Sequence, residues 1–104
     1  MLLAPFFLLL PTVCLAGSIT GRVTSIFVAN DSAVVLFKVD GAFRETPRCN
    51  ESGYFAIHTA KKGGVNVYRA ILEAKAQQYT VEVLGLNTCT TNWKAEDVRN
   101  IEIR

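Results

Sequence analysis

Cysteine and histidine are the residues of this sequence with the widest chemistry, and they are few. The chain has three cysteines, Cys14, Cys49 and Cys89, and one histidine, His58. A structural zinc site usually takes four such ligands at short spacings, and only three of these residues, Cys49, His58 and Cys89, lie beyond the apolar N-terminal stretch. A Cys–His nucleophile pair is the other use, but His58 lies on an alternating pattern that is typical of a strand. The pattern favours neither a metal site nor a catalytic pair.

Residues 1–16 have the pattern of a secretory signal peptide. The short apolar run "LLAPFFLLL" is followed by Cys14 and Ala16, small residues three and one positions before a cut ahead of Gly17. The run is about nine residues long, against roughly 20 for a spanning helix, so we expect no stable membrane insertion after cleavage. An uncleaved anchor and a lipid-modified Cys14 are the alternatives. The pattern predicts a secreted or periplasmic domain over residues 17–104.

Removal of the signal peptide would leave Cys49 and Cys89. An even cysteine count in a small exported chain indicates one disulfide. A bridge that closes a loop of about 40 residues stabilises a domain by on the order of 4 kcal/mol. A free or reactive thiol and a metal site stay open as weaker interpretations.

The carboxylates are scattered, apart from the adjacent pair Glu96 and Asp97. We interpret this pair as part of a solvated loop that shields the last strand, since adjacent side chains on a loop or strand point apart. A calcium-type or acid/base pair is the alternative. The sequence has no Gly-rich phosphate loop and no serine elbow. We therefore expect no enzyme activity, no catalytic residues, no metal and no cofactor.

The charge of the chain is nearly balanced. Eleven basic residues face nine acidic ones, for a net charge of +2. Proteins that bind nucleic acid usually carry a clustered basic face. We expect no nucleic-acid partner.

The candidate residues stand on a pattern of five strands and one helix. Strands are predicted over residues 18–29, 33–41, 54–60, 79–85 and 98–104, a turn over 30–32, and a helix over 65–78. The last strand needs a bulge near Asn100, because Val98 and Ile101 otherwise face opposite sides. The order β-β-β-α-β-β predicts an OB-fold, a five-stranded antiparallel Greek-key barrel, here with one disulfide.

Trp93 is the aromatic residue with the clearest choice of roles. It follows Cys89 in a short polar loop, "LNTCTTNW". An indole combines a large apolar face with a polar tip, so it suits either a core or a binding surface. Trp93 is predicted either to cover the disulfide and the end of the barrel or to form a ligand platform.

The order of motifs along residues 17–104 resembles a bacterial family, the subtilase cytotoxin B subunits and the related pertussis-like toxin B subunits. The matching features begin with a "TG-V" strand and a second strand that ends in "VDG". They continue with a cysteine before the third strand, the helix "YRAILEAKAQ" that runs into a "V-V" strand, and finally "L-L-TCTT". The features are spread across nearly all of the predicted mature chain.

This resemblance implies an exported OB-fold with a Cys49–Cys89 bridge. It implies assembly into a homopentamer with a toxin A subunit, and binding of cell-surface glycans that are often sialylated. The family's hydroxyl residue on the first strand falls on Thr20, and an acidic residue after the second strand falls on Asp40. The family's tyrosine at the end of the helix falls near Lys75, so that aromatic contact is lost.

The sequence thus leads to two main expectations about function, and a small hydrolase or inhibitor is a third, weaker alternative. The first is an exported binding module that resembles toxin B subunits and recognises cell-surface glycans. The second is a stand-alone periplasmic protein that binds a protein partner or a small molecule. The candidate ligand-binding residues are Thr20, Asp40 and Trp93.

Overall fold

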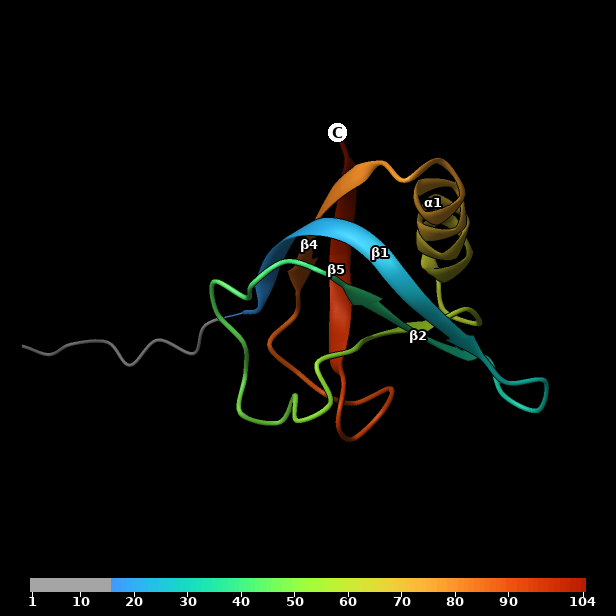
Figure 1. The fold of residues 1–104 in the computed structure, drawn as a ribbon. Helices are drawn as coiled ribbons and strands as arrows, with labels where there is room; N and C mark the ends of the chain where they lie inside the picture. Colours follow the sequence, from blue (N-terminus) through green and yellow to red (C-terminus); the bar gives the residue numbers. More distant parts are fainter. Residues whose placement is uncertain (1–15) are drawn as a thin grey trace, which may run out of the picture.

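A computed structural model describes residues 16–104, and these form a small β-barrel with one helix (Figure 1). Residues 1–15 of the predicted signal peptide, Cys14 among them, lie outside the described residues. The elements are β1 Ser18–Val28, β2 Val34–Val39, β3 Phe55–His58, α1 Gly64–Gln77, β4 Thr80–Gly85 and β5 Glu96–Ile103. In the part of the chain that the structure describes, no helix is both long and apolar enough to cross a membrane.

Strand β1 is long enough to pair with two different strands, one along each half of its length. Its first half pairs with β4, from Ser18 opposite Leu84, and its second half pairs with β2. The register with β2 shifts between Val23 and Ser25, where β1 passes from one partner to the other. This irregularity lets the strand curve, as the ribbon in Figure 1 shows. The turn predicted over residues 30–32 joins β1 to β2, and the two strands form a hairpin.

The five strands close into a barrel in the order β1-β2-β3-β5-β4. Four of the pairings are antiparallel, but β3 and β5 pair in parallel, with Phe55 opposite Glu96 and Ala56 opposite Asp97. The expectation of a wholly antiparallel sheet was wrong. A closed ring with an odd number of strands cannot alternate direction throughout, so one neighbouring pair must be parallel.

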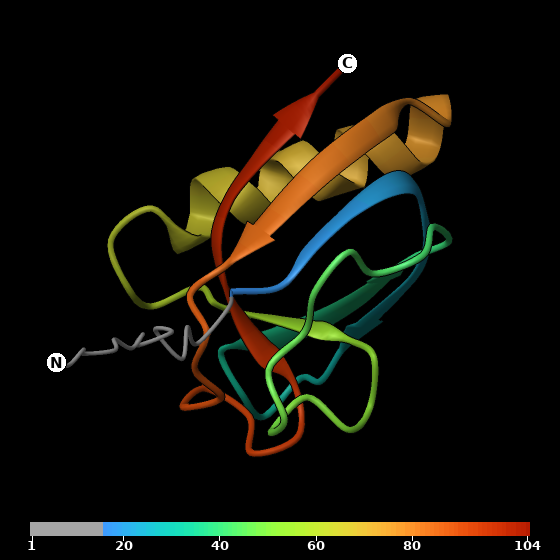
Figure 2. The ribbon, with the colours of Figure 1, turned by 90° about the vertical axis from the view of Figure 1, so that its left-hand side faces the viewer.

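Helix α1 packs against β1, β3 and β5 and lies along one side of the barrel (Figure 2). Its sequence is rich in residues that favour helices, and Ile71 and Ala74 are its buried face. The helix ends at Gln77, and the next residue, Gln78, takes a left-handed conformation and donates its backbone N–H to carbonyls of the last turn. The observed bounds lie one residue before the predicted ones at both ends.

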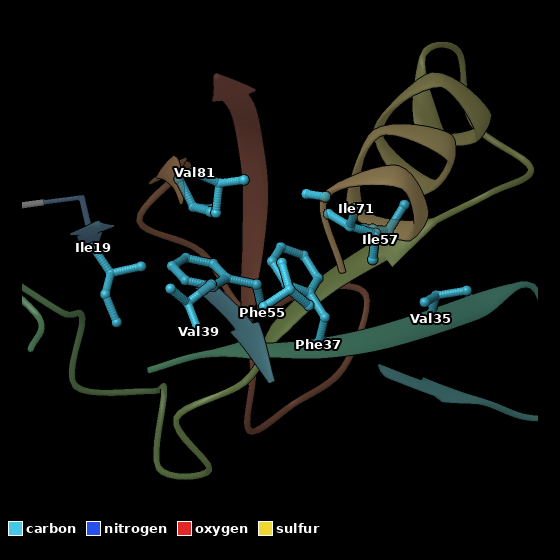
Figure 3. Close-up of a cluster of buried hydrophobic side chains, with 11 residues drawn as sticks. Ile19, Val35, Phe37, Val39, Phe55, Ile57, Ile71 and Val81 are labelled. Atoms are coloured by element: carbon cyan, nitrogen blue, oxygen red, sulfur yellow. The ribbon is translucent and has the colours of Figure 1, made fainter. Parts of the chain in front are cut away.

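The core fills the barrel and the space beneath α1 (Figure 3). Phe37 and Phe55 are fully buried, with ring centroids 5.6 Å apart. The other buried members come from β1, β2, β3, β4 and α1: Ile19, Val23, Val35, Val39, Ile57, Ile71, Ala74, Val81 and Val83. This core fixes the loops at the two ends of the barrel.

Strand β5 begins two residues earlier than predicted. Glu96 and Asp97 are its first residues, and they are 0% and 6% exposed, so the interpretation of a solvated loop was wrong. The register with β4 jumps from Asn100 to Val98, which leaves Arg99 as the extra residue of a bulge. The predicted bulge is therefore confirmed.

Cys49 and Cys89 form the predicted disulfide, with 6.1 Å between their Cα atoms. The bridge joins the loop before β3 to the loop before β5. Figures 1 and 2 both place these two loops side by side at one end of the barrel. The free-thiol and metal interpretations of these two cysteines were wrong.

Candidate functional site

Asp97 organises the loop between β4 and β5. Its Oδ2 accepts hydrogen bonds from the hydroxyls of Thr88 (2.6 Å) and Thr90 (2.7 Å) and from the Thr90 backbone N–H (2.9 Å). Its Oδ1 accepts from the Thr91 backbone N–H at 3.0 Å. The threonines around Cys89 are therefore held in place by one carboxylate. The threonines of this loop are thus accounted for by their hydrogen bonds to Asp97.

These hydrogen bonds change the acidity of Asp97. Burial by itself raises the pKa of a carboxyl group, but the bonds from Thr88, Thr90 and Thr91 favour the charged form more strongly. The result is a pKa lowered from 3.8 to about 2. Asp97 is thus an ionised anchor at neutral pH, with its oxygens already engaged by the loop. This environment is the opposite of the one that a general acid needs.

Glu96 and Asp97 do not form one site. The Glu96 carboxylate accepts backbone N–H bonds from Gly17 and Asn87, while Asp97 binds the threonines. Among residues 16–104, no group of three or more His, Cys, Asp or Glu side chains is placed to hold a metal ion. The two adjacent carboxylates act on opposite sides of β5.

A cleft of about 280 Å³ opens next to the part of the β4–β5 loop that contains Thr88, Thr90 and Thr91, called the threonine loop below. It lies between the end of β3, the beginning of α1 and the bulge of β5. Its polar lining is His58, Lys61, Lys62, Thr88, Thr90, Thr91, Asp97 and Arg99, and its apolar lining includes Ala56, Ile57, Val67, Leu86 and Val98. Three permanently basic side chains face one acidic side chain. The cleft is a mixed surface of cations, hydroxyls and short apolar patches.

The first turn of α1 adds to the positive character of this cleft. Gly63 and Gly64 line it, and the helix begins without a side-chain cap or an acidic residue in its first turn. The positive end of a helix dipole favours negative charge, and here no side chain of that turn offsets it. The cleft suits a ligand with an anionic group.

Thr20 and Asp40 lie on neighbouring segments of β1 and the end of β2. Asp40 accepts the Arg22 backbone N–H through Oδ1 (2.8 Å), and its own N–H donates to the Arg22 carbonyl (2.9 Å). Asp40 thus continues the ladder of β1 and β2 after the strand itself has ended. Both Thr20 and Asp40 are exposed, and neither lines the cleft.

Trp93 lies on the surface of the loop between β4 and β5. Its side chain is 73% exposed, which excludes the role of a core lid. The Nζ atom of Lys94 lies 4.4 Å from the centroid of the indole ring, a cation–π contact. Thr20 and Asp40 lie on adjacent segments, and within residues 16–104 no hydrogen bond or ring contact joins Trp93 to either of them.

The basic side of the cleft escaped the sequence analysis. Lys61 and Lys62 belong to "KKGG", a pattern that we interpreted only as a break between a strand and the helix. Arg99 belongs to a predicted strand. The sequence did contain a signal for Lys61 and Lys62. Two lysines followed by two glycines near the start of a predicted helix place positive charge at the helix N-terminus. Arg99 reaches the cleft through the bulge of β5, which no local pattern locates to one residue.

Scans against protein-family models, curated proteins and solved structures found no match for this chain.

Proposed function

We propose that this chain is an exported binding module with an OB-fold that recognises glycans bearing an acidic group. The strand order β1-β2-β3-β5-β4, with the helix between β3 and β4, supports the OB-fold. The disulfide supports export, because such bridges persist in oxidising compartments. The resemblance to toxin B subunits supports the glycan as the ligand class.

The observation that carries the proposal is the lining of the cleft. Lys61, Lys62 and Arg99 supply cationic donors for a carboxylate, and the fork of an arginine matches the two oxygens of such a group. Thr88 and Thr90 already donate their hydroxyl protons to Asp97, so each hydroxyl oxygen has only acceptor capacity left for a ligand. Cationic donors beside hydroxyl acceptors suit a sugar acid, which carries a carboxylate and several hydroxyls.

The size of the cleft limits how much of a glycan it holds. Ligand pockets typically measure roughly 300–1,000 Å³, and this cleft of about 280 Å³ lies at the lower limit. We expect it to hold one terminal sugar, and Leu86 and Val67 are the apolar lining residues that would pack against the ring. The rest of the glycan extends over the surface.

A glycan array that compares sialylated glycans with their desialylated counterparts tests this proposal. We expect retention of sialylated glycans only, and a loss of at least about fivefold in affinity for Arg99→Ala or Lys62→Ala, as a charged contact gives. The matched control is Arg69→Ala, which removes a basic side chain from the exposed side of α1 and should bind like the wild type. Equal binding of both glycan sets, or equal loss in the control, contradicts the proposal.

The same resemblance extends the proposal to a homopentamer that carries a toxin A subunit. A native mass of five protomers supports this assembly. A monomer that still binds glycans contradicts the ring but leaves the glycan site in place.

A second candidate function is the binding of a protein partner by a stand-alone periplasmic protein. The exposure of Trp93 (73%) and Phe27 (57%) supports it, because large exposed aromatic side chains are frequent in protein interfaces. A monomer without glycan binding, together with a periplasmic partner whose capture is lost in Trp93→Ala, selects this function instead.

A further inference from the structure

Glu96 is a buried carboxylate without an opposite charge. It is 0% exposed, and its Oε2 accepts only backbone N–H groups, from Gly17 at 2.8 Å and Asn87 at 2.9 Å. Its Oε1 is buried and finds no hydrogen-bond partner. The ion pairs present among residues 16–104 all involve other carboxylates. A buried charge that lacks a counter-ion is costly, so this arrangement calls for a positive group.

The backbone around Glu96 comes unusually close to both of its oxygens. A Cβ atom at position 17 would overlap Oε1, and one at position 85 would overlap Oε2 and the carboxyl carbon. Glycine is the residue that permits such a close approach. Gly17 and Gly85 thus enclose the carboxylate from two sides. Both oxygens of Glu96 lie against Gly17.

The position of the Gly17 nitrogen is fixed by the residues that follow it. The Gly17 carbonyl accepts the Gly85 N–H at 2.9 Å, and Ser18 exchanges bonds with the segment at Arg44 and Glu45. Gly17 is buried while Ala16 is exposed. The chain therefore enters the folded domain at the bond between Ala16 and Gly17.

This bond is also the one at which the sequence predicts removal of the signal peptide. We propose that the Ala16–Gly17 bond is a processing site and that the α-ammonium group formed on Gly17 makes a buried ion pair with Glu96. The inference rests on the export that is part of the proposed function. It adds a role for Glu96 that the glycan site does not use.

The chemistry of the step needs only water and the protease that removes leaders during export. Hydrolysis breaks the C–N bond between Ala16 and Gly17, and one water supplies an oxygen to the Ala16 carboxylate and two hydrogens to the Gly17 nitrogen. The amide N–H of Gly17 is one donor, whereas an ammonium group has three. The new group keeps the bond to Oε2, reaches the unpartnered Oε1 and neutralises the carboxylate.

The ion pair depends on the position of the cut. A chain that starts at Ala16 keeps an uncharged amide at Gly17, and a chain that starts at Ser18 lacks the nitrogen that Glu96 binds. Only cleavage before Gly17 completes the site. The precursor is thus less stable than the processed protein, and folding is coupled to export.

The first experiment expresses the full chain with its own leader in an exporting bacterial host and measures the intact mass of the exported protein. We expect a chain that begins at Gly17. A chain that begins at any other residue overturns the inference, whatever the protein binds.

The second experiment measures stability. Residues 17–104, which contain the whole core, are released from a fusion either with a free Gly17 amine or with one additional alanine before it. We expect the free-amine form to melt on the order of 10 °C higher, because it alone pairs the buried charge. Glu96→Gln should abolish this difference. The control Glu73→Gln, an exposed carboxylate on α1, should retain it.

Equal melting temperatures of the two wild-type forms overturn the inference, as does a difference that persists in Glu96→Gln. If Glu96→Gln does not fold, the reactivity of the Gly17 amine towards an acylating reagent decides the question in the wild-type protein. We expect at least tenfold slower labelling in the folded protein than in urea, and equal rates would refute the ion pair. None of these measurements involves a glycan, so they stand or fall separately from the proposed ligand.

Discussion

Thr90 is bound to Asp97 twice, through its hydroxyl at 2.7 Å and its backbone N–H at 2.9 Å, and both bonds end on the same oxygen. Asp97 thereby connects the first residues of β5 to the threonine loop that carries Cys89. The disulfide holds the same loop from its other side. The wall of the cleft is thus fixed by one carboxylate and one covalent bond.

Replacement of Asp97 by asparagine should loosen this wall. An amide keeps the shape of the side chain but loses the charge that strengthens the four hydrogen bonds, so we expect a loss of about 1–3 kcal/mol in the free energy of unfolding. Urea denaturation measures this loss. Asp31→Asn, in the exposed turn between β1 and β2, is the control and should change stability by less than about 0.5 kcal/mol.

The acidity of Asp97 predicts how stability depends on pH. The pKa of Asp97 is lowered to about 2 in the folded protein from its ordinary value of 3.8, so the unfolded state binds the proton more readily. The contribution of Asp97 to stability is present above pH 3.8 and disappears as the pH falls through about 2. Between pH 5 and 2, Asp97→Asn should therefore lose less stability than the wild type. Parallel pH profiles would argue against this role.

The bridge between Cys49 and Cys89 should account for a large share of stability. We expect the double substitution Cys49→Ser and Cys89→Ser to lower the free energy of unfolding by about 2–5 kcal/mol. Thermal unfolding of the oxidised wild type, the reduced wild type and the double variant measures this. The last two should agree, and a double variant as stable as the oxidised protein contradicts the prediction.

Gly85→Ala tests the close approach of the backbone to Glu96. Because the new Cβ atom would overlap the carboxylate, we expect a loss of about 1–3 kcal/mol. In a Glu96→Ala background the same substitution should have little further effect, since the obstacle is gone. A loss of equal size in both backgrounds would assign the effect to the backbone of Gly85 itself.

Trp93→Ala should leave the fold intact. The side chain is 73% exposed, so we expect a change of less than about 0.5 kcal/mol in the free energy of unfolding. A loss of glycan or partner binding without a loss of stability identifies Trp93 as part of a binding surface. A drop of several degrees in melting temperature would instead indicate a structural role.

The order of the strands and the helix could be predicted from the sequence, because most of these elements carry a local signal. Alternation located the first part of β1, β3 and β4, and the bulge in β5 followed from the opposite parity of Val98 and Ile101. The beginning of β5 was missed because Glu96 and Asp97 are polar, and local pattern assigns polar residues to loops. Their burial depends on partners far along the chain, Gly17 in one case and the threonine loop in the other.

The candidate site was harder to predict than the fold. Thr20, Asp40 and Trp93 were each identified by type or by resemblance. The structure places Thr20 and Asp40 on adjacent segments, but none of the three lines the cleft. The cleft is instead formed where three segments distant in sequence meet: the lysines before α1, the threonine loop and Arg99. Such a meeting depends on how the barrel closes, and no single stretch of sequence describes that closure.

The location of the disulfide also bears on how quickly the barrel can form. The parallel pairing of Phe55 with Glu96 joins residues about as far apart in sequence as the two cysteines, which are separated by 40 residues. Contacts of such long range slow folding, because the chain loses conformational entropy before they form. Once Cys49 and Cys89 are joined, that loss has already occurred, and β3 and β5 need only close a short remaining gap. Oxidation of the two cysteines would thus act as the step that sets the order of assembly.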